Sequence, residues 1–106
     1  MTPHVFKNGV LTIPEGVVEL EDEAFVFRED IREVWLPSTL KRIGKSAFQE
    51  CVNLEVVHFQ EGLEVVGFAA FCNCLSLPRP QLPKGVIIEE LAFHGTEQIE
   101  EKGEKT

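Results

Sequence analysis

Cysteine and histidine are the residues of this chain that could carry out catalytic or metal chemistry. The sequence holds three of each. Cys72 and Cys74 form a Cys-x-Cys pair, and His58 and His94 lie elsewhere in the chain. A zinc site needs about four convergent ligands at recognised spacings, and the sequence lacks those spacings. We therefore predict no metal site and no cofactor.

A cysteine nucleophile with a histidine base is the second chemistry to consider. Cys72 and His94 fall at the same place in two neighbouring copies of the repeat described below, but no third group is in place to orient the base. The sequence has no G-x-S-x-G elbow, no phosphate-binding loop and no H-E-x-x-H pair. We predict no catalytic residues and a protein that is not an enzyme.

A repeat organises the whole chain. The dipeptide Ala-Phe occurs four times, with its aromatic residue at Phe25, Phe48, Phe71 and Phe93. An apolar residue before Pro or Gln recurs every 23 residues, at Ile13, Leu36, Phe59 and Leu82. The last copy is one residue shorter than the others. Repeats of this length are typical of a solenoid, in which each unit buries its apolar side only against its neighbours.

The second copy, LPSTLKRIGKSAFQECVNLEVV, shows the shared pattern most completely. This pattern resembles the BspA-like leucine-rich repeat family, whose unit reads LPxxLxxIGxxAFxxCxxLxxI. The resemblance covers Leu11 to Ile99. It implies a parallel-stranded solenoid without catalytic residues, of a kind found mostly in surface proteins that bind other proteins or host matrix.

Alternation of apolar and variable positions predicts one short strand in each copy. Parallel strands of successive copies would lie about 4.8 Å apart, and the four Phe residues of the Ala-Phe dipeptides would stack beneath them. The predicted fold is a mainly β repeat solenoid, a right-handed leucine-rich-repeat array of about four coils. Short parallel strands are expected on one face and turns or short helical segments on the other. The side chains expected to point inward are Leu11, Ile13, Val34, Leu36, Val57 and Phe59.

Three segments are expected along the chain. Residues 1–10 would form an N-terminal cap, with Val5 and Phe6 followed by a turn at Lys7 to Gly9. Residues 11–99 hold the four repeat copies, and the charged residues 100–106 are expected to be a solvated tail. Pro80 is expected to interrupt the strand of the last copy.

Cys51 and Cys74 occupy the same column of adjacent copies. In-register stacking would bring their α-carbons within disulfide range, at about 5 Å. The alternative, which we favour, is a ladder of buried, unreactive thiols, because parallel side chains point the same way and not at each other. Cys72 falls in a variable column and is expected to react first with a thiol reagent.

Charge and hydropathy restrict the partners. The net charge of −8 would repel nucleic acid, so no nucleic-acid partner is expected. The chain has no apolar run long enough to span a bilayer, and no leader at its start, so no membrane insertion is expected. As written the sequence indicates a cytoplasmic protein, whereas the family resemblance implies the cell surface if the chain is a trimmed family member.

The outward residues of the predicted strands are the best functional candidates. One column holds Thr12, Trp35, His58 and Gln81, and Glu33 lies in the column beside it. Trp35, the only tryptophan, is either a partner contact, as its type suggests, or a cover for neighbouring apolar surface. We predict a non-catalytic module that binds a protein or peptide on this face. Its site residues would be Trp35, His58, Thr12, Gln81, Arg32 and Glu33.

A structural or self-association unit is the alternative function, and the chain could then be a fragment of a larger surface protein or a weak homo-oligomer. Phe27 and Phe68 motivate this alternative, because both fall in columns that otherwise hold polar residues or glycine. Each ring either marks an association surface or packs locally against the turns.

Overall fold

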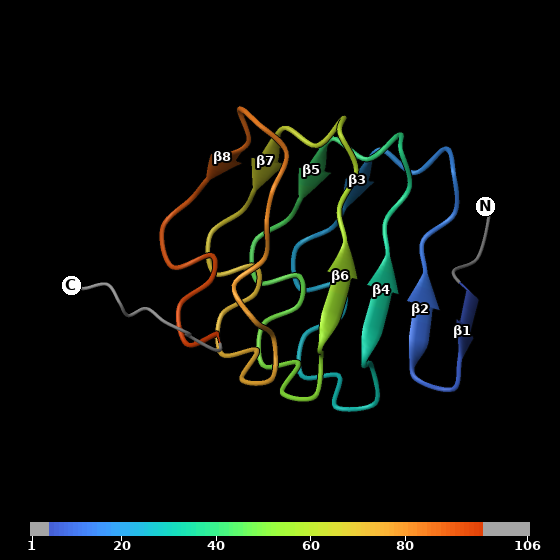
Figure 1. Ribbon diagram of the computed structural model, residues 1–106, viewed down its shortest axis with the longest axis vertical. Helices are drawn as coiled ribbons and strands as arrows, with labels where there is room; N and C mark the ends of the chain where they lie inside the picture. The colour runs from blue at the N-terminus through green and yellow to red at the C-terminus, as the bar shows by residue number, and fades with distance from the viewer. Residues whose placement is uncertain (1–4, 97–106) are drawn as a thin grey trace.

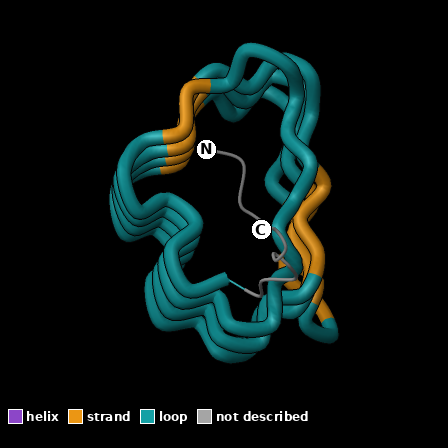
Figure 2. The backbone as a smooth tube through the Cα atoms, turned by 60° about the vertical axis from the view of Figure 1, so that its left-hand side comes forward, coloured by secondary structure: helices purple, strands orange, loops and turns teal. Residues whose placement is uncertain are grey.

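The computed structural model describes residues 5–96, which form a right-handed, mainly β solenoid without a helix (Figure 1). Viewed nearly along the solenoid axis, the coils superpose and the strands gather on two sides (Figure 2). The coils complete about three turns, slightly fewer than the four expected from the sequence.

The first sheet contains the strands that alternation predicted. Its order is β1 (Val5–Lys7), β2 (Val10–Thr12), β4 (Glu33–Trp35) and β6 (Val56–His58). The last three are parallel and in register, so that Leu11 pairs with Val34 and Val34 with Val57. Leu11 and Val34 are buried, as expected for the inward side of these strands.

A second parallel sheet lies on the opposite side, where turns or short helical segments were expected. It is formed by β3 (Glu19–Leu20), β5 (Arg42–Ile43), β7 (Val65–Val66) and β8 (Ile87–Ile88). Each strand has two residues, of which the second points inward, and Leu20, Ile43 and Val66 are buried. Among residues 5–96 the side opposite the first sheet therefore contains strands and turns but no helix.

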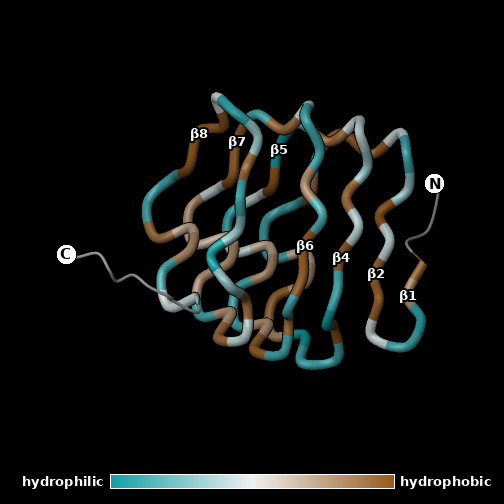
Figure 3. The backbone as a smooth tube through the Cα atoms, in the orientation of Figure 1, coloured by the Kyte–Doolittle hydropathy of each residue, from teal (hydrophilic) through white to brown (hydrophobic). Residues whose placement is uncertain are grey.

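The predicted aromatic spine runs through the core. Phe25, Phe48, Phe71 and Phe93 stack in sequence, with ring centroids 5.3, 5.1 and 5.2 Å apart. Hydrophobic segments recur at equivalent places of successive coils (Figure 3). Each coil therefore covers the rings of the coil before it, as a solenoid requires.

Backbone hydrogen bonds join the coils on the turn side as well. The N–H groups of Ala69, Phe71 and Asn73 donate to carbonyls of the next coil at 3.1, 2.7 and 2.7 Å. Two positions in each of these turns have left-handed φ. They form the columns Glu23, Ser46, Ala69 and Leu91, and Phe27, Glu50, Asn73 and Gly95.

An antiparallel hairpin closes the N-terminal end of the first sheet. β1 pairs with β2, and the turn between them contains Asn8 and Gly9, with φ of 53° and 83°. Positive φ at both central residues is the geometry of a two-residue hairpin turn. Phe6 lies 5.1 Å from the Arg28 guanidinium. Residues 1–4 of the expected cap and the expected tail, 100–106, lie outside the described residues.

The fourth copy contributes no strand to the first sheet. Pro78 and Pro80 flank Arg79, and proline has no N–H to donate to a ladder. The prediction that Gln81 continues the column of Trp35 and His58 on this sheet is therefore wrong.

Candidate functional site on the strand face

The outward side of the first sheet, here called the strand face, brings together most of the predicted site residues. Parallel pairing places Thr12 beside Trp35 and Trp35 beside His58. Glu33 points to the same side as Trp35, two residues away, because the intervening Val34 is buried. The strand face thus forms a flat surface carried by three short parallel strands.

Trp35 and His58 stack on each other at the centre of this surface. Their ring centroids are 3.5 Å apart and the rings are inclined by only 12°. His58 Nε2 lies 2.7 Å from Glu33 Oε2, which fixes the imidazole from its other end. Trp35 nevertheless remains 43% exposed. The structure therefore has a large aromatic side chain that is held in place and open to solvent.

The opposite side of the indole is less crowded. Its neighbour there is Thr12, whose side chain is much smaller than an imidazole. Beyond Thr12 the face continues to Val5, which pairs with Thr12 and is exposed. Sequence reasoning missed Val5 as a residue of this face. The two-residue turn at Asn8 and Gly9 was the available signal, because it fixes the register of the hairpin.

Arg32, another of the predicted site residues, is exposed and contacts the hairpin turn between β1 and β2. Its Nη2 donates to the Asn8 carbonyl at 3.1 Å, and its backbone N–H donates to the Gly9 carbonyl at 2.7 Å. A side chain at Gly9 would place its Cβ only 2.9 Å from Arg32 Nε. Arg32 therefore packs over the hairpin turn, and its part in binding a partner stays a prediction.

Gln81 lies at the margin of the strand face and not in its ladder. It lines a shallow hollow of about 190 Å³ between β6 and the segment 77–81, together with Val56, Val57 and Arg79. The hollow exists because the proline-flanked segment does not form a strand beside β6. Gln81 could therefore meet a partner that extends from His58 past Val56 into this hollow.

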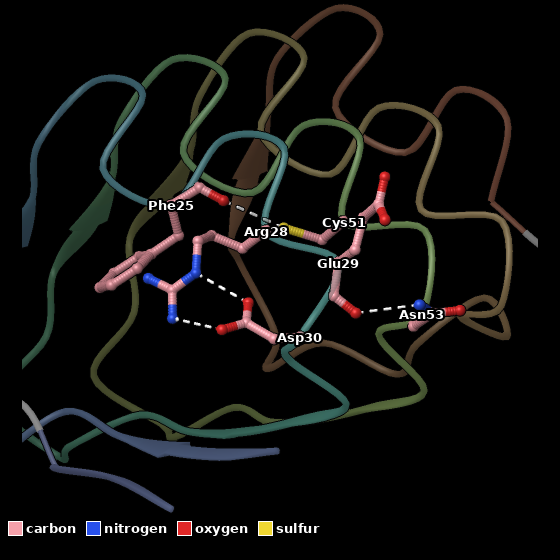
Figure 4. Close-up of polar contacts among 6 residues, drawn as sticks. All are labelled: Phe25, Arg28, Glu29, Asp30, Cys51 and Asn53. Atoms are coloured by element: carbon pink, nitrogen blue, oxygen red, sulfur yellow. Dashed lines mark hydrogen bonds and ion pairs between the residues drawn. The ribbon is translucent and has the colours of Figure 1, made fainter.

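The cysteines form a buried ladder. Cys51 Sγ donates to the Phe25 carbonyl at 3.1 Å (Figure 4), and Cys74 Sγ donates to the Phe48 carbonyl at the same distance. Burial raises the pKa of Cys51 to about 11 and that of Cys74 to about 12, from an ordinary value of 9.0. All three cysteines are free. The ladder of inert thiols is the arrangement that the sequence favoured.

Cys72 is less accessible than its variable column suggested. Its residue exposure is 7%, compared with 0% for Cys51 and Cys74, and burial raises the pKa of its thiol as well. The thiol is therefore a poor nucleophile at neutral pH. Its expected precedence in thiol labelling stays a prediction, because it remains the most exposed of the three.

Phe27 and Phe68 are both exposed, at 66% and 39%. Phe27 lies in the turn column of Glu50 and Asn73 in the first coil, and Phe68 lies in the third coil in the column of Lys45. The two rings thus belong to different columns and to coils that are not neighbours.

Metal and membrane sites have no support among residues 5–96. No group of three His, Cys, Asp or Glu side chains in this range is arranged to hold a metal ion. None of these residues forms a helix with the length and apolar character needed to cross a bilayer.

Comparison with known proteins decides the family. The sequence matches the model of the BspA type leucine rich repeat region over residues 5–102, in which it fits six copies. The chain belongs to the BspA-type leucine-rich repeat family. The six family copies are more numerous than the four that the 23-residue period gives.

Solved structures support the same assignment. A leucine rich cell surface protein from Faecalibacterium prausnitzii A2-165 superposes with a TM-score of 0.79 and 29% identity over 84% of this chain. A leucine-rich repeat protein from Bacteroides ovatus ATCC 8483 superposes with a TM-score of 0.74 and 25% identity over 89% of this chain. A leucine-rich repeat protein from T. pallidum shares the fold, with a TM-score of 0.63 and 24% identity over 82%. No curated protein matches the chain.

The chain spans 24%, 31% and 54% of the lengths of these three proteins. Family membership makes it a repeat module of the general protein-interaction type, in a family that is typically non-enzymatic.

Proposed function

We propose that the strand face binds a protein or peptide partner, with Trp35 at the centre of the contact. The observation that supports this most strongly is the stack of Trp35 on His58 at 3.5 Å, with His58 held by Glu33. A side chain that is already fixed loses little conformational entropy when a partner covers it. Tryptophan is also among the residues most enriched at binding hot spots. The chain would then act as a non-catalytic interaction module.

The surroundings of Trp35 favour a partner that offers apolar groups. Val10 and Val56 flank Glu33 in the neighbouring column, and Val56 is exposed. Thr12 leaves one side of the indole open for a flat or branched apolar group. Nucleic acid is not the partner we propose, since the net charge of −8 opposes contact with phosphates.

The single tryptophan makes the proposal testable without labelling. Peptides selected from a displayed library against the immobilised chain should change the fluorescence of Trp35 when they bind. The Trp35→Ala variant should bind them more weakly by at least about 2 kcal/mol, the usual hot-spot threshold. Phe27→Ala, which removes an exposed aromatic ring in a turn outside the first sheet, is the matched control and should bind normally. Loss of binding in Phe68→Ala with full binding in Trp35→Ala would place the site on the turn side instead.

Self-association remains the alternative function, and Phe27 and Phe68 are its candidates. Their separation into different columns and non-neighbouring coils makes them a weaker surface than the continuous strand face. Sedimentation equilibrium of the chain separates the two proposals. A concentration-independent monomer supports the interaction module, whereas an oligomer that Phe27→Ala or Phe68→Ala dissociates supports self-association.

The cell surface is the location we propose for this function. The support is that the Faecalibacterium prausnitzii relative is described as a leucine rich cell surface protein. Antibody labelling of intact cells of the source organism tests the location, and labelling only after lysis would contradict it.

A further inference from the structure

The indole of Trp35 has one covered face and one open face. His58 stacks on one side, with the ring centroids 3.5 Å apart. The residue paired with Trp35 on the other side is Thr12, and no ring among residues 5–96 stacks on the indole there. Trp35 is 43% exposed. The open face, on the side of Thr12, is therefore available to one further flat group.

Two hydrogen-bond acceptors beside the indole make no hydrogen bond among residues 5–96. Glu33 contacts His58 Nε2 through Oε2 at 2.7 Å, and its Oε1 has no hydrogen-bond partner within this range. The hydroxyl of Thr12, which is exposed, has none there either. A carboxylate only accepts hydrogen bonds, and a hydroxyl can accept them as well as donate. The surroundings of the indole therefore favour a group that brings hydrogen-bond donors.

Electrostatics favour a donor that is positively charged. The face of an indole ring is electron-rich and attracts cations. The carboxylate of Glu33 lies on the same surface, two residues from Trp35, and the net charge of the chain is −8. A negative surface steers basic partners towards it. A cationic side chain therefore complements the open face in both charge and hydrogen bonding.

Among residues 5–96, no cation of the chain itself lies over Trp35. Arg32 donates through Nη2 to a carbonyl of the hairpin turn, at 3.1 Å. Arg28 lies over the ring of Phe6, 5.1 Å from its centroid. Lys7 is in β1, and β2 separates that strand from β4, which carries Trp35. The open face is therefore left to a cation from another molecule.

Arginine fits these requirements better than lysine. Its guanidinium is planar, stacks on aromatic faces and carries five N–H donors. A guanidinium stacked on the indole keeps its donors free for Thr12 and Glu33, because they project from the edge of its plane. Its methylene stem is apolar and suits Val5, the exposed neighbour of Thr12. The ammonium of lysine is compact and strongly hydrated, so it covers less of a flat ring.

We propose that the strand face recognises its protein or peptide partner through an exposed arginine of that partner. The guanidinium stacks on the open face of Trp35 and donates to the Thr12 hydroxyl and to Glu33 Oε1. Trp35 supplies the contact area, whereas Thr12 and Glu33 determine the specificity for a charged donor. His58 holds the indole and the carboxylate in place from the covered side.

The probes for the test are displayed peptides that change the fluorescence of Trp35 when they bind the full chain. Arginine should be enriched among them relative to the unselected library. Replacing this arginine in the tightest peptide by citrulline, which has the same shape without the charge, should weaken binding about tenfold. Replacing it by lysine should weaken binding at least about threefold. Equal binding of the citrulline peptide, or no enrichment of arginine, would overturn the proposal, and equal binding of the lysine peptide would overturn the choice of arginine.

Variants of the chain locate the guanidinium. Glu33→Gln keeps a hydrogen-bonding group for His58 and removes the charge. It should weaken binding of the arginine peptide about threefold and leave binding of the citrulline peptide unchanged. Thr12→Val replaces the hydroxyl by a methyl group and should weaken the arginine peptide by about the same factor. Glu23→Gln, at an exposed turn outside the first sheet, is the matched control for net charge and should bind normally. Full binding of the arginine peptide by Glu33→Gln, or equal weakening of both peptides, would overturn the role of Glu33.

This inference rests on the proposed function, but the two fail in different ways. Peptides that bind the Trp35→Ala variant as tightly as the parent chain would contradict the proposed function itself. Peptides that need Trp35 but bind equally well with arginine or citrulline would leave the proposed function standing and contradict only the arginine.

Discussion

The two ends of the solenoid are built on the same repeat columns but are finished differently. At the N-terminal end Leu20 and Phe25 are buried and β1 extends the first sheet. Arg28 lies beside Phe25 (Figure 4), and its guanidinium lies over the ring of Phe6. At the C-terminal end Ile88, in the column of Leu20, is 47% exposed. The repeat therefore fixes the column of a residue, whereas the neighbouring coil or cap fixes its burial.

The largest expected effect contrasts the middle of the aromatic spine with its end. Phe48→Ala should lower the free energy of unfolding by about 3 to 5 kcal/mol, because Phe48 is fully buried between two other rings. Phe93→Ala should cost clearly less, because one side of its ring has no neighbouring ring among the described residues. Urea denaturation of both variants measures the difference. Equal losses would mean that the C-terminal end is as well covered as the middle.

The buried thiols give the next effect, which depends on pH. The folded-state pKa values of Cys51 and Cys74, about 11 and about 12, exceed the ordinary value of 9.0. The unfolded chain therefore loses these protons first. The contribution of these two thiols to the free energy of unfolding is fully present below about pH 9. It falls as the pH rises towards 11 and 12, by at most about 1.4 kcal/mol per pH unit for each thiol.

Denaturation at several pH values between 8 and 11 tests this dependence. Cys51→Ala should reduce the slope of stability against pH, and Cys72→Ala, which removes the most exposed of the three thiols, should reduce it less. An unchanged slope in Cys51→Ala would show that its thiol is not shielded from solvent by the coils on either side.

The hairpin at the N-terminal end, in which Phe6 lies, should contribute least to the free energy of unfolding. Phe6→Ala removes the ring beneath the Arg28 guanidinium and should cost about 1 kcal/mol, given the partial exposure of Phe6. Phe27→Ala, at a ring that is 66% exposed, should cost less than about 0.5 kcal/mol. Thermal unfolding of the two variants compares them. If Phe6→Ala is as harmless as Phe27→Ala, the hairpin does not close the end of the core.

The strand face could be predicted from the sequence because its strands have three residues and alternate clearly. Val34 points inward between Glu33 and Trp35, so the columns of the face follow from the 23-residue period. The period also placed Trp35 beside His58. It did not show that the two rings stack or that Glu33 reaches diagonally to His58, since these contacts depend on side-chain rotamers.

The second sheet could not be predicted, because two residues are too few to show alternation. In β5 only Arg42 and Ile43 are extended, a pattern that fits a turn or a helix equally well. The predicted place of Gln81 in the column of Trp35 and His58 was wrong for another reason. Pro78 and Pro80 both lack the N–H that a strand beside β6 would donate. The contact of Arg32 with the hairpin turn could not be predicted either, because its long side chain reaches back to a turn that a single repeat column does not describe.

Hydrogen exchange of backbone amides tests most directly the claim that β1 covers the first coil at the N-terminal end, whereas no residue among 5–96 covers Ile88 and Phe93 in the last described coil. The N–H groups of Phe48 and Phe71, which donate to Ala70 and Ala92 at 2.7 Å, should be strongly protected. The N–H groups of Leu91, Phe93 and Gly95 in the free chain should exchange close to the rates of an unstructured peptide. Protection of these three amides as strong as that of Phe71 would contradict the account, because the C-terminal end would then already be covered.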